Sequence, residues 1–195
     1  DDTESDDCDG AAPVCDATSH TCRACTEHTE CAAGLCLDGT CPAEGDILWV
    51  DGDAACDDAG SGTSAAPFCE IQAALDNGSA ELIAVREDVS DDYAPISWVS
   101  GGSATIVAVE AGASIFQSTA TEPAVRCING STLTVVGMTI TGRKEGTVTG
   151  PGITTSDCTL TLTDVNVSEN GGAGISATGG TATLTDVNVS GNGGA

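Results

Sequence analysis

Few groups in this sequence could act as a base or activate a nucleophile. The 195-residue chain has two histidines, and the second is His28, so a Ser-His-Asp site cannot form in the rest of the chain. The bases after residue 80 are Arg86, Arg126, Arg143 and Lys144, and the last two are expected at an exposed loop tip. The acid pairs 57–58 and 91–92 are adjacent residues, which point to opposite faces of a strand and cannot flank one bond together. We therefore predict no catalytic residue in the chain.

Clustered carboxylates are better candidates for a metal site. Asp51, Asp53, Asp57 and Asp58 lie within eight residues, next to glycines that can turn the backbone. Hard oxygen ligands suit Ca²⁺, although the spacing is not that of an EF-hand. The alternative is an acidic loop surrounded by solvent. No cofactor other than Ca²⁺ is expected.

Cysteine is concentrated at the start of the chain, where almost nothing apolar can be buried. Seven of the 11 cysteines lie between Cys8 and Cys41. A segment so short needs covalent or metal staples in place of a core. In this acidic context the pattern indicates disulfides formed in an oxidising compartment. Zinc is the alternative, because His20, Cys22, Cys25 and His28 have zinc-like spacing.

An odd number of cysteines leaves one of them without a partner in this segment. We expect it to be Cys8, next to the acidic run 1–7, with its partner upstream of Asp1 or on another chain. The other six are expected to pair among themselves, in an order that the sequence does not give: Cys15, Cys22, Cys25, Cys31, Cys36 and Cys41. Their spacing resembles that of the small cysteine-rich modules of surface proteins from predatory and gliding bacteria.

The net charge excludes several classes of partner. Thirty acidic residues against five Lys and Arg give a formal charge of −25, which repels the phosphates of nucleic acids and acidic membrane surfaces. No apolar run reaches the roughly 18 residues that span a bilayer, so no transmembrane segment is expected. The chain begins at Asp1 without a basic and apolar leader, so we expect any export signal to have been removed.

Two near-identical segments, 159–173 and 181–195, reveal an internal repeat. Thirteen of 15 positions are identical at an offset of 22 residues, and a diverged copy, 132–141, begins 27 residues before Thr159. Repeats of this length indicate stacked structural units. Within a copy the apolar residues alternate, as in Leu160 and Leu162, which predicts strands with one buried face.

A break in this alternation predicts a bend within each copy. Three positions lead from Leu162 to Val165, a glycine pair at 171–172 supplies another corner, and Ile175 lies on a third side. Three short strands in 22–27 residues describe one coil of a parallel β-helix, which is an all-β solenoid. An antiparallel β-sandwich is the alternative, but it does not explain near-identical copies.

Stacked coils place equivalent residues about 4.8 Å apart. Asn166 then lies on Asn188, and Asn170 lies on Asn192. These pairs are expected to form ladders of hydrogen-bonded amides; sugar binding is the alternative role.

The same stacking brings together two other pairs. Asp164 and Asp186 should form a carboxylate pair whose repulsion raises one pKa or recruits a cation. Cys127 and Cys158 fall on neighbouring coils, about three residues out of register, and are a candidate disulfide.

Residues 46–80 are expected to close the first coil. A strand at 46–51 leads into a Gly/Ser/Asp loop and then into 67–76, where Ile71, Ala74 and Leu75 share one helical face. Such a helix can cap a solenoid. Cys56 and Cys69 flank the loop and are predicted to form a disulfide. The chain thus divides into a cysteine-rich module, 1–45, and a β-helix, 46–195, with coils from 81.

The segments Trp49-Val50-Asp51-Gly52, 62–64 and 67–75, followed by the coils, resemble the right-handed parallel β-helix proteins of the pectate-lyase-like superfamily. The resemblance covers residues 46–195 and implies the fold, but this fold hosts many functions. Its lyases place Arg or Lys beside Ca²⁺-binding acids, and its polygalacturonases use paired aspartates with Gly-His-Gly. This chain has no Arg-x-Pro-x-x-Arg pattern and no histidine in the coils.

These observations favour a non-catalytic extracellular or cell-surface protein that binds a glycan or a protein. A carbohydrate-active enzyme with its site outside this segment is one alternative, and a filament subunit is another. The last coil stops before its third strand, so its open end is expected to be completed by further chain or by a second copy.

Overall fold

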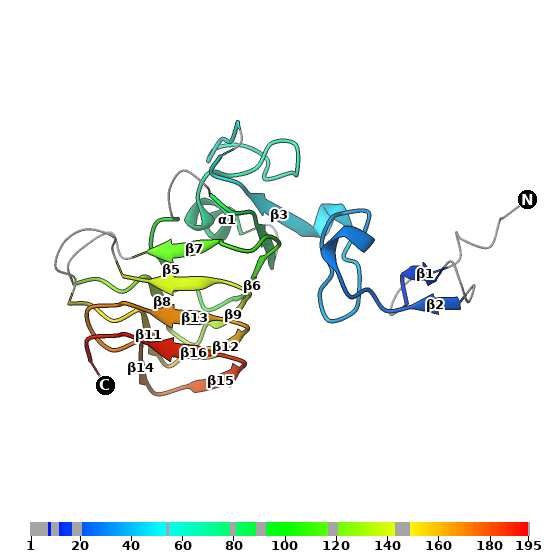
Figure 1. The fold of residues 1–195 in the computed structure, drawn as a ribbon. Helices are drawn as coiled ribbons and strands as arrows, with labels where there is room; N and C mark the ends of the chain where they lie inside the picture. The colour runs from blue at the N-terminus through cyan, green and yellow to red at the C-terminus, as the bar shows by residue number, and fades with distance from the viewer. Residues whose placement is uncertain are drawn as a thin grey trace, which may run out of the picture. The chain divides into compact units, whose positions relative to one another are not determined.

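The computed structural model describes residues 8, 12–16, 21–53, 55–78, 81–88, 93–116, 121–142 and 149–194. The chain divides into two units, Asp1–Ile47 and Leu48–Ala195, and Figure 1 labels most of their strands and the α-helix. Within the described residues, no helix is long and apolar enough to cross a bilayer.

The first unit is held together by disulfides around very short elements. Its strands β1 (Val14–Asp16) and β2 (Thr21–Arg23) form an antiparallel hairpin, and 3-10 helices cover His28–Glu30 and Glu44–Asp46. The disulfides join Cys8 to Cys22, Cys25 to Cys36, and Cys31 to Cys41. Sulfurs in disulfides are not thiolate ligands, so the zinc alternative does not hold for these cysteines; His20 lies outside the described residues.

The expectation that Cys8 is the odd cysteine is wrong, because the structure leaves Cys15 as the free thiol. The physical reason is a correspondence between two hairpins. In the first hairpin, Asp16 pairs with Thr21, and these two residues are the loop-side neighbours of Cys15 and Cys22. In the second, Leu37 pairs with Thr40, and these two are the loop-side neighbours of Cys36 and Cys41. Cys22 bonds back to Cys8 as Cys41 bonds back to Cys31. Cys15 therefore occupies the place of Cys36, which bonds to Cys25, and none of residues 1–7 is a cysteine that could take the part of Cys25.

The second unit is built from parallel strands and one short helix. Its elements are β3 (Ile47–Val50), α1 (Ile71–Asn77), β4 (Leu82–Val85), β5 (Ile96–Trp98), β6 (Ser103–Ala108), β7 (Ser114–Phe116), β8 (Val125–Ile128), β9 (Thr132–Val136), β10 (Thr139–Thr141), β11 (Ile153–Ser156), β12 (Thr159–Thr163), β13 (Asn166–Ser168), β14 (Ile175–Thr178), β15 (Thr181–Thr185) and β16 (Asn188–Ser190).

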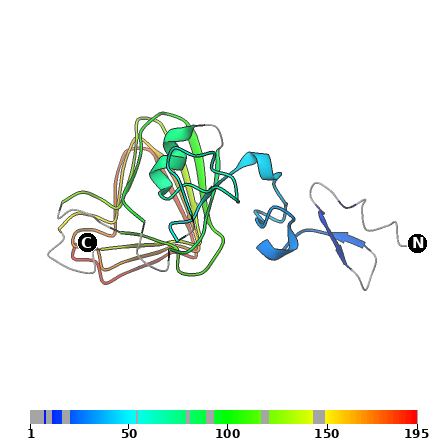
Figure 2. The same ribbon diagram turned by 90° about the horizontal axis from the view of Figure 1, so that it is seen from above.

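From β5 onward, successive strands go to three different sheets in turn. The sheets have the orders β14-β11-β8-β5, β15-β12-β9-β6-β4-β3 and β16-β13-β10-β7, and neighbouring strands pair in parallel. We call each passage of the chain through the three sheets a coil; the traces of successive coils overlap in the view of Figure 2. The all-β prediction with parallel sheets is confirmed, and the arrangement is compatible with a β-helix.

Alternating apolar residues fill the interior, as the repeat predicts. Leu160, Leu162 and Val167 are fully buried, and Val165 is 1% exposed. Leu162 pairs in register with Leu184, which is 49% exposed because no further described coil covers it. Burying a Leu or Val side chain stabilises a fold by about 1.5–3 kcal/mol, so each covered coil adds several such contributions.

Left-handed backbone residues make the corners between strands. Asp164 has φ 54° and Asp186 has φ 53°, at the position where the apolar alternation breaks. Asp157 has φ 51° at the corner before β12. Asp tolerates this conformation better than most residues because its short side chain can bond to the local backbone.

The corner at Asp157 explains how two cysteines out of register can meet. Cys127 lies opposite Thr155 in the β8–β11 pairing, three residues before Cys158. The turn at Asp157 brings Cys158 inward, where both sulfur-bearing residues are buried, and a disulfide joins them.

The loop before α1 is clipped to the helix at two points. A disulfide joins Cys56 to Cys69. Asp58 accepts hydrogen bonds through Oδ1 from the backbone N–H groups of Cys69 and Glu70, at 2.8 and 3.1 Å. These donors precede the first helical residue, so the carboxylate satisfies backbone groups that a helix start leaves unpaired. Ile71, Ala74 and Leu75 form the buried helix face, as predicted.

Candidate functional site

Three of the four carboxylates of the predicted calcium loop, those of Asp51, Asp57 and Asp58, bind different partners in the structure. Asp51 forms an ion pair with Arg86, with 3.1 Å between Oδ2 and Nη1. Asp57 accepts from the backbone N–H of Ala59 at 2.9 Å, and Asp58 binds the start of α1. Asp53 donates its backbone N–H to Oδ1 of Asp51. The carboxylates thus shape the loop, and calcium binding there stays a prediction.

Arg86 is engaged on three sides and has a structural role. Its guanidinium lies 4.7 Å from the ring centroid of the buried Trp49, within the range of a cation–π contact. Its Nη2 donates to Oγ of Ser64 at 2.9 Å, in addition to the Asp51 ion pair. These contacts fasten the loop onto the outside of β3.

Tyr93 also anchors the loop that follows β3. Its hydroxyl donates to the carbonyl oxygen of Arg86 at 2.7 Å and accepts from the N–H of Gly52 at 3.2 Å. Burial raises the pKa of the Tyr93 phenol, and nearby carboxylates, including Asp88, raise it further. The phenol therefore stays protonated and keeps its donor role at ordinary pH.

The predicted Asp164–Asp186 pair lies at one corner of successive coils. Both residues have the same left-handed conformation and both side chains are exposed. Exposure to water screens their repulsion, and a shared cation at this corner stays a prediction.

Both predicted asparagine pairs are joined by hydrogen bonds between coils. Asn188 donates from Nδ2 to Oδ1 of Asn166, and Asn170 donates from Nδ2 to Oδ1 of Asn192, each at 2.9 Å. Asn170 is 1% exposed and also donates to the carbonyl oxygen of Ile140. The Asn170 pair is therefore structural, because its amides satisfy backbone carbonyls inside a corner.

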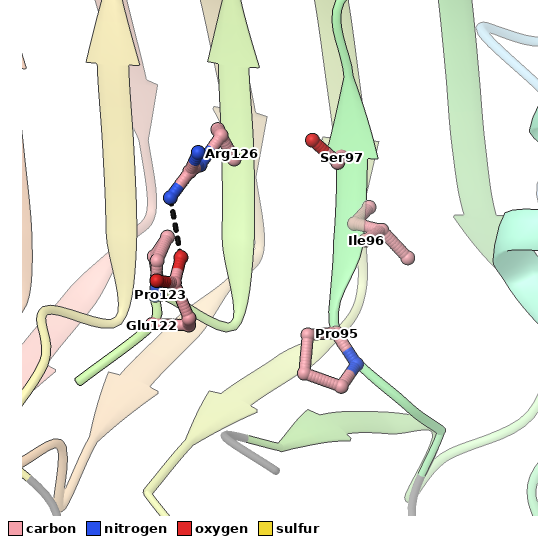
Figure 3. A pocket seen from close by; sticks show the side chains of 6 residues that line it. All are labelled: Pro95, Ile96, Ser97, Glu122, Pro123 and Arg126. Atoms are coloured by element: carbon pink, nitrogen blue, oxygen red, sulfur yellow. Dashed lines mark hydrogen bonds and ion pairs between the residues drawn. The ribbon is translucent and has the colours of Figure 1, made fainter. Parts of the chain in front are cut away.

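An open hollow on the sheet β14-β11-β8-β5 has the mixture of groups that a ligand site needs. It has a volume of about 190 Å³ and lies between the ends of β5 and β8, as Figure 3 shows. The lining residues are Pro95, Ile96, Ser97, Glu122, Pro123 and Arg126.

Within the hollow, donors and acceptors stand beside apolar rings. Arg126 donates from Nη2 to the Glu122 carboxylate, and the two side chains remain 42% and 58% exposed. Ser97 is exposed on the neighbouring strand, directly opposite Arg126 in the register. Pro95 is partly exposed and supplies apolar surface, whereas Ile96 and Pro123 are buried beneath the hollow. A guanidinium, a carboxylate and a hydroxyl within one hollow can together donate to and accept from a polyhydroxylated ligand.

Stacking extends this hollow into a polar row across four coils. Arg126 pairs with Ser97 on one side and with Thr154 on the other, and Thr154 pairs with Ser176. The side chains alternate with buried Val125 and Cys127, so the row faces outward. A linear ligand could follow it from coil to coil.

Sequence reasoning placed Arg126 among the few bases but did not find this hollow. Its two halves, 95–97 and 122–126, come from diverged coils outside the near-identical copies. Aligning Ser97 with Arg126 requires the strand register, which no motif in those segments gives. Arg143 and Lys144 lie outside the described residues.

Comparisons with protein families, with curated proteins and with solved structures gave no match for this chain. The candidate site therefore rests on its own geometry.

Proposed function

We propose that the protein is a non-catalytic extracellular or cell-surface protein that binds a neutral glycan through the hollow at Arg126. In this proposal the second unit is a right-handed parallel β-helix of the pectate-lyase-like type, and the protein is secreted by a bacterium. Five disulfides indicate an oxidising compartment.

The observation that carries the proposal is the pairing of Arg126 and Glu122 beside Ser97. A sugar ring presents hydroxyl groups around its edge and C–H groups on its faces. The ion pair and the serine can bond to the hydroxyls, and the partly exposed Pro95 can pack on the face. The volume of about 190 Å³ is below that of a typical drug-sized pocket, which suits a single sugar residue of a longer chain.

The charge of the protein favours a neutral ligand over an acidic one. The formal charge of −25 repels polyanions at long range, and Glu122 already occupies the guanidinium that an acidic sugar would need. The hollow also has one carboxylate, whereas glycoside hydrolysis uses two that flank the bond. Binding without cleavage is the function that this arrangement supports.

Calorimetric titration with neutral xylo-, manno- and gluco-oligosaccharides tests the proposal. At least one series should bind, and both Arg126→Gln and Glu122→Gln should weaken that binding by about tenfold or more, since a hydrogen bond to a charged group contributes about 1.5–3 kcal/mol. Arg23→Gln is the matched control, because it breaks a similar Arg–Glu pair in the first unit.

The two variants also separate neutral from acidic ligands. Glu122→Gln should strengthen binding of a uronic-acid oligosaccharide by freeing Arg126 and should weaken binding of a neutral one. Tighter binding of the acidic than of the neutral oligosaccharide by the wild-type protein, or unchanged neutral binding in both variants, would contradict the proposal.

End-to-end stacking is a second candidate, supported by one observation. Leu184 and Val189 of the outermost described coil stand in register with the buried Leu162 and Val167 and are 49% and 48% exposed. Exposed apolar surface and open strand edges are templates for another chain. Light scattering should detect association that Leu184→Ser with Val189→Ser abolishes; a monomeric parent protein would remove this candidate.

A further inference from the structure

Threonine dominates the outer face of the sheet β15-β12-β9-β6. All three outward positions of β12 and of β15 are threonine, and β9 has threonine at two of its three. The central column consists of Thr105, Thr134, Thr161 and Thr183, one from each coil. The inward neighbours Leu160 and Leu162 are buried, so the threonines point away from the core. We call the outward positions of β9, β12 and β15, together with Ser103 and Thr105 of β6, the threonine face; Val107, the third outward position of β6, is buried.

The register makes the threonine face a regular lattice. Thr134 pairs with Thr161 and Thr161 pairs with Thr183 without any shift along the strands. Neighbouring strands lie about 4.7–4.9 Å apart, and alternate residues of one strand are roughly 6.6–6.8 Å apart. The hydroxyl groups therefore repeat in two perpendicular directions with fixed spacings.

Side-chain chemistry preserves this order. Threonine is branched at Cβ, so its χ1 is restricted and neighbouring methyl and hydroxyl groups can take the same orientation. None of the outward positions on these four strands is charged, in a chain whose formal charge is −25. Charged side chains would order water around themselves and break the pattern, whereas methyl and hydroxyl rows leave water free to follow the spacing of the protein.

We propose that the threonine face binds ice. The two repeats of the face are close to the spacings between water oxygens on a flat surface of hexagonal ice. Water held in the rows between methyl groups, and bonded to the hydroxyls, can thus continue into the crystal. Adsorption requires an ordered and uncharged surface, and the strands paired in register supply both properties. This inference does not depend on the proposed glycan site, which lies on a different sheet.

Partition of the whole chain into slowly growing ice measures this binding. The wild-type protein should enter the ice fraction, whereas albumin of equal concentration should stay in the liquid. Thr161→Tyr places a large side chain in the middle of the central column and should remove most of the ice-bound fraction. Tyrosine is compatible with strands, so circular dichroism and the melting temperature should remain near those of the wild type.

Thr139→Tyr is the matched control. Thr139 is also an outward, half-buried threonine, but it lies on β10 of another sheet, between Ser114 and Asn166. This variant should partition into ice as the wild type does, and so should Arg126→Gln. Failure of the glycan site and failure of the ice site therefore give different results.

Three results would overturn the inference. One is a wild-type protein that stays in the liquid with albumin. Another is equal partition of the Thr161→Tyr and Thr139→Tyr variants. The third is binding to crystalline cellulose or chitin that Thr161→Tyr abolishes while ice partition is unaffected, which would assign the threonine face to a polysaccharide surface instead.

Discussion

Asn170 donates its side-chain Nδ2 to Oδ1 of Asn192 across 2.9 Å, and this bond joins two coils at a buried corner. Asn192 in turn donates to the carbonyl oxygen of Val167 at 3.0 Å. The two amides thus donate to the backbone carbonyls of Ile140 and Val167 on the neighbouring coils.

Replacing the buried asparagine should destabilise the protein much more than replacing its exposed counterpart. Asn170→Ala should lower the free energy of unfolding by about 2–3 kcal/mol, because buried carbonyl groups lose their donor. Asn170→Asp should cost more, since a carboxylate would face the carbonyl of Ile140. Asn166→Ala, at an exposed ladder, should cost less than about 1 kcal/mol. Urea unfolding checks the order; equal costs at 170 and 166 would refute it.

Removal of either disulfide in the second unit should be costly. The Cys127→Ala/Cys158→Ala and Cys56→Ala/Cys69→Ala double variants should each lose about 2–4 kcal/mol of stability in the chain-entropy model. The first closes a separation of 31 residues and the second closes 13, so the first should lose roughly 0.7 kcal/mol more. Guanidinium unfolding of both variants measures the difference, and a larger loss in the 56/69 variant would contradict it.

Alkylation should identify Cys15 as the free thiol. It is partly exposed and has no disulfide partner, so iodoacetamide should label it in the native, unreduced protein. Peptide mapping then locates the label. Modification at Cys8 would show that the first hairpin pairs as Cys15–Cys22 instead.

The Arg23–Glu30 pair should give the first unit a measurable acid transition. The hydrogen bond from Arg23, followed by one from the N–H of Thr26, lowers the pKa of Glu30 from 4.5 to about 2. A lowered pKa in the folded state means that the pair stabilises the unit fully above pH 4.5 and that this contribution is lost as the pH falls through about 2. Solvent screening keeps the contribution small.

The amide resonance of Thr26 reports this titration directly, because its N–H donates to Glu30 at 2.7 Å. Its chemical shift should change with a midpoint near pH 2, and Arg23→Gln should move the midpoint toward 4.5. A wild-type midpoint already near 4.5 would mean that the ion pair does not form in solution.

The repeat explains why much of the second unit was predictable. The alternation of apolar residues around Leu162 indicates which side chains are buried, and the break before Val165 indicates a corner. The 22-residue offset then indicates which residues of successive coils pair with each other. Pairings that depend on three-dimensional register were harder. The Cys8–Cys22 bond follows from a correspondence between two hairpins whose loops differ in length, which obscures it in the sequence.

The candidate site was less predictable than the fold. The acidic loop suggested a metal site from composition, but the structure shows Asp51 bound to Arg86 and Asp58 bound to the start of α1. The hollow at Arg126 combines residues from two coils that share no motif, so only the strand register reveals it.

Amide chemical shifts recorded during titration with the neutral oligosaccharide that binds most tightly test whether the glycan site lies at Arg126. Perturbations are expected at Ser97, Arg126 and Thr154, which stand side by side on β5, β8 and β11. Resonances of Thr139 and Asn166 on the neighbouring sheet should not move. Perturbations confined to that neighbouring sheet, or to the first unit, would contradict a glycan site at Arg126.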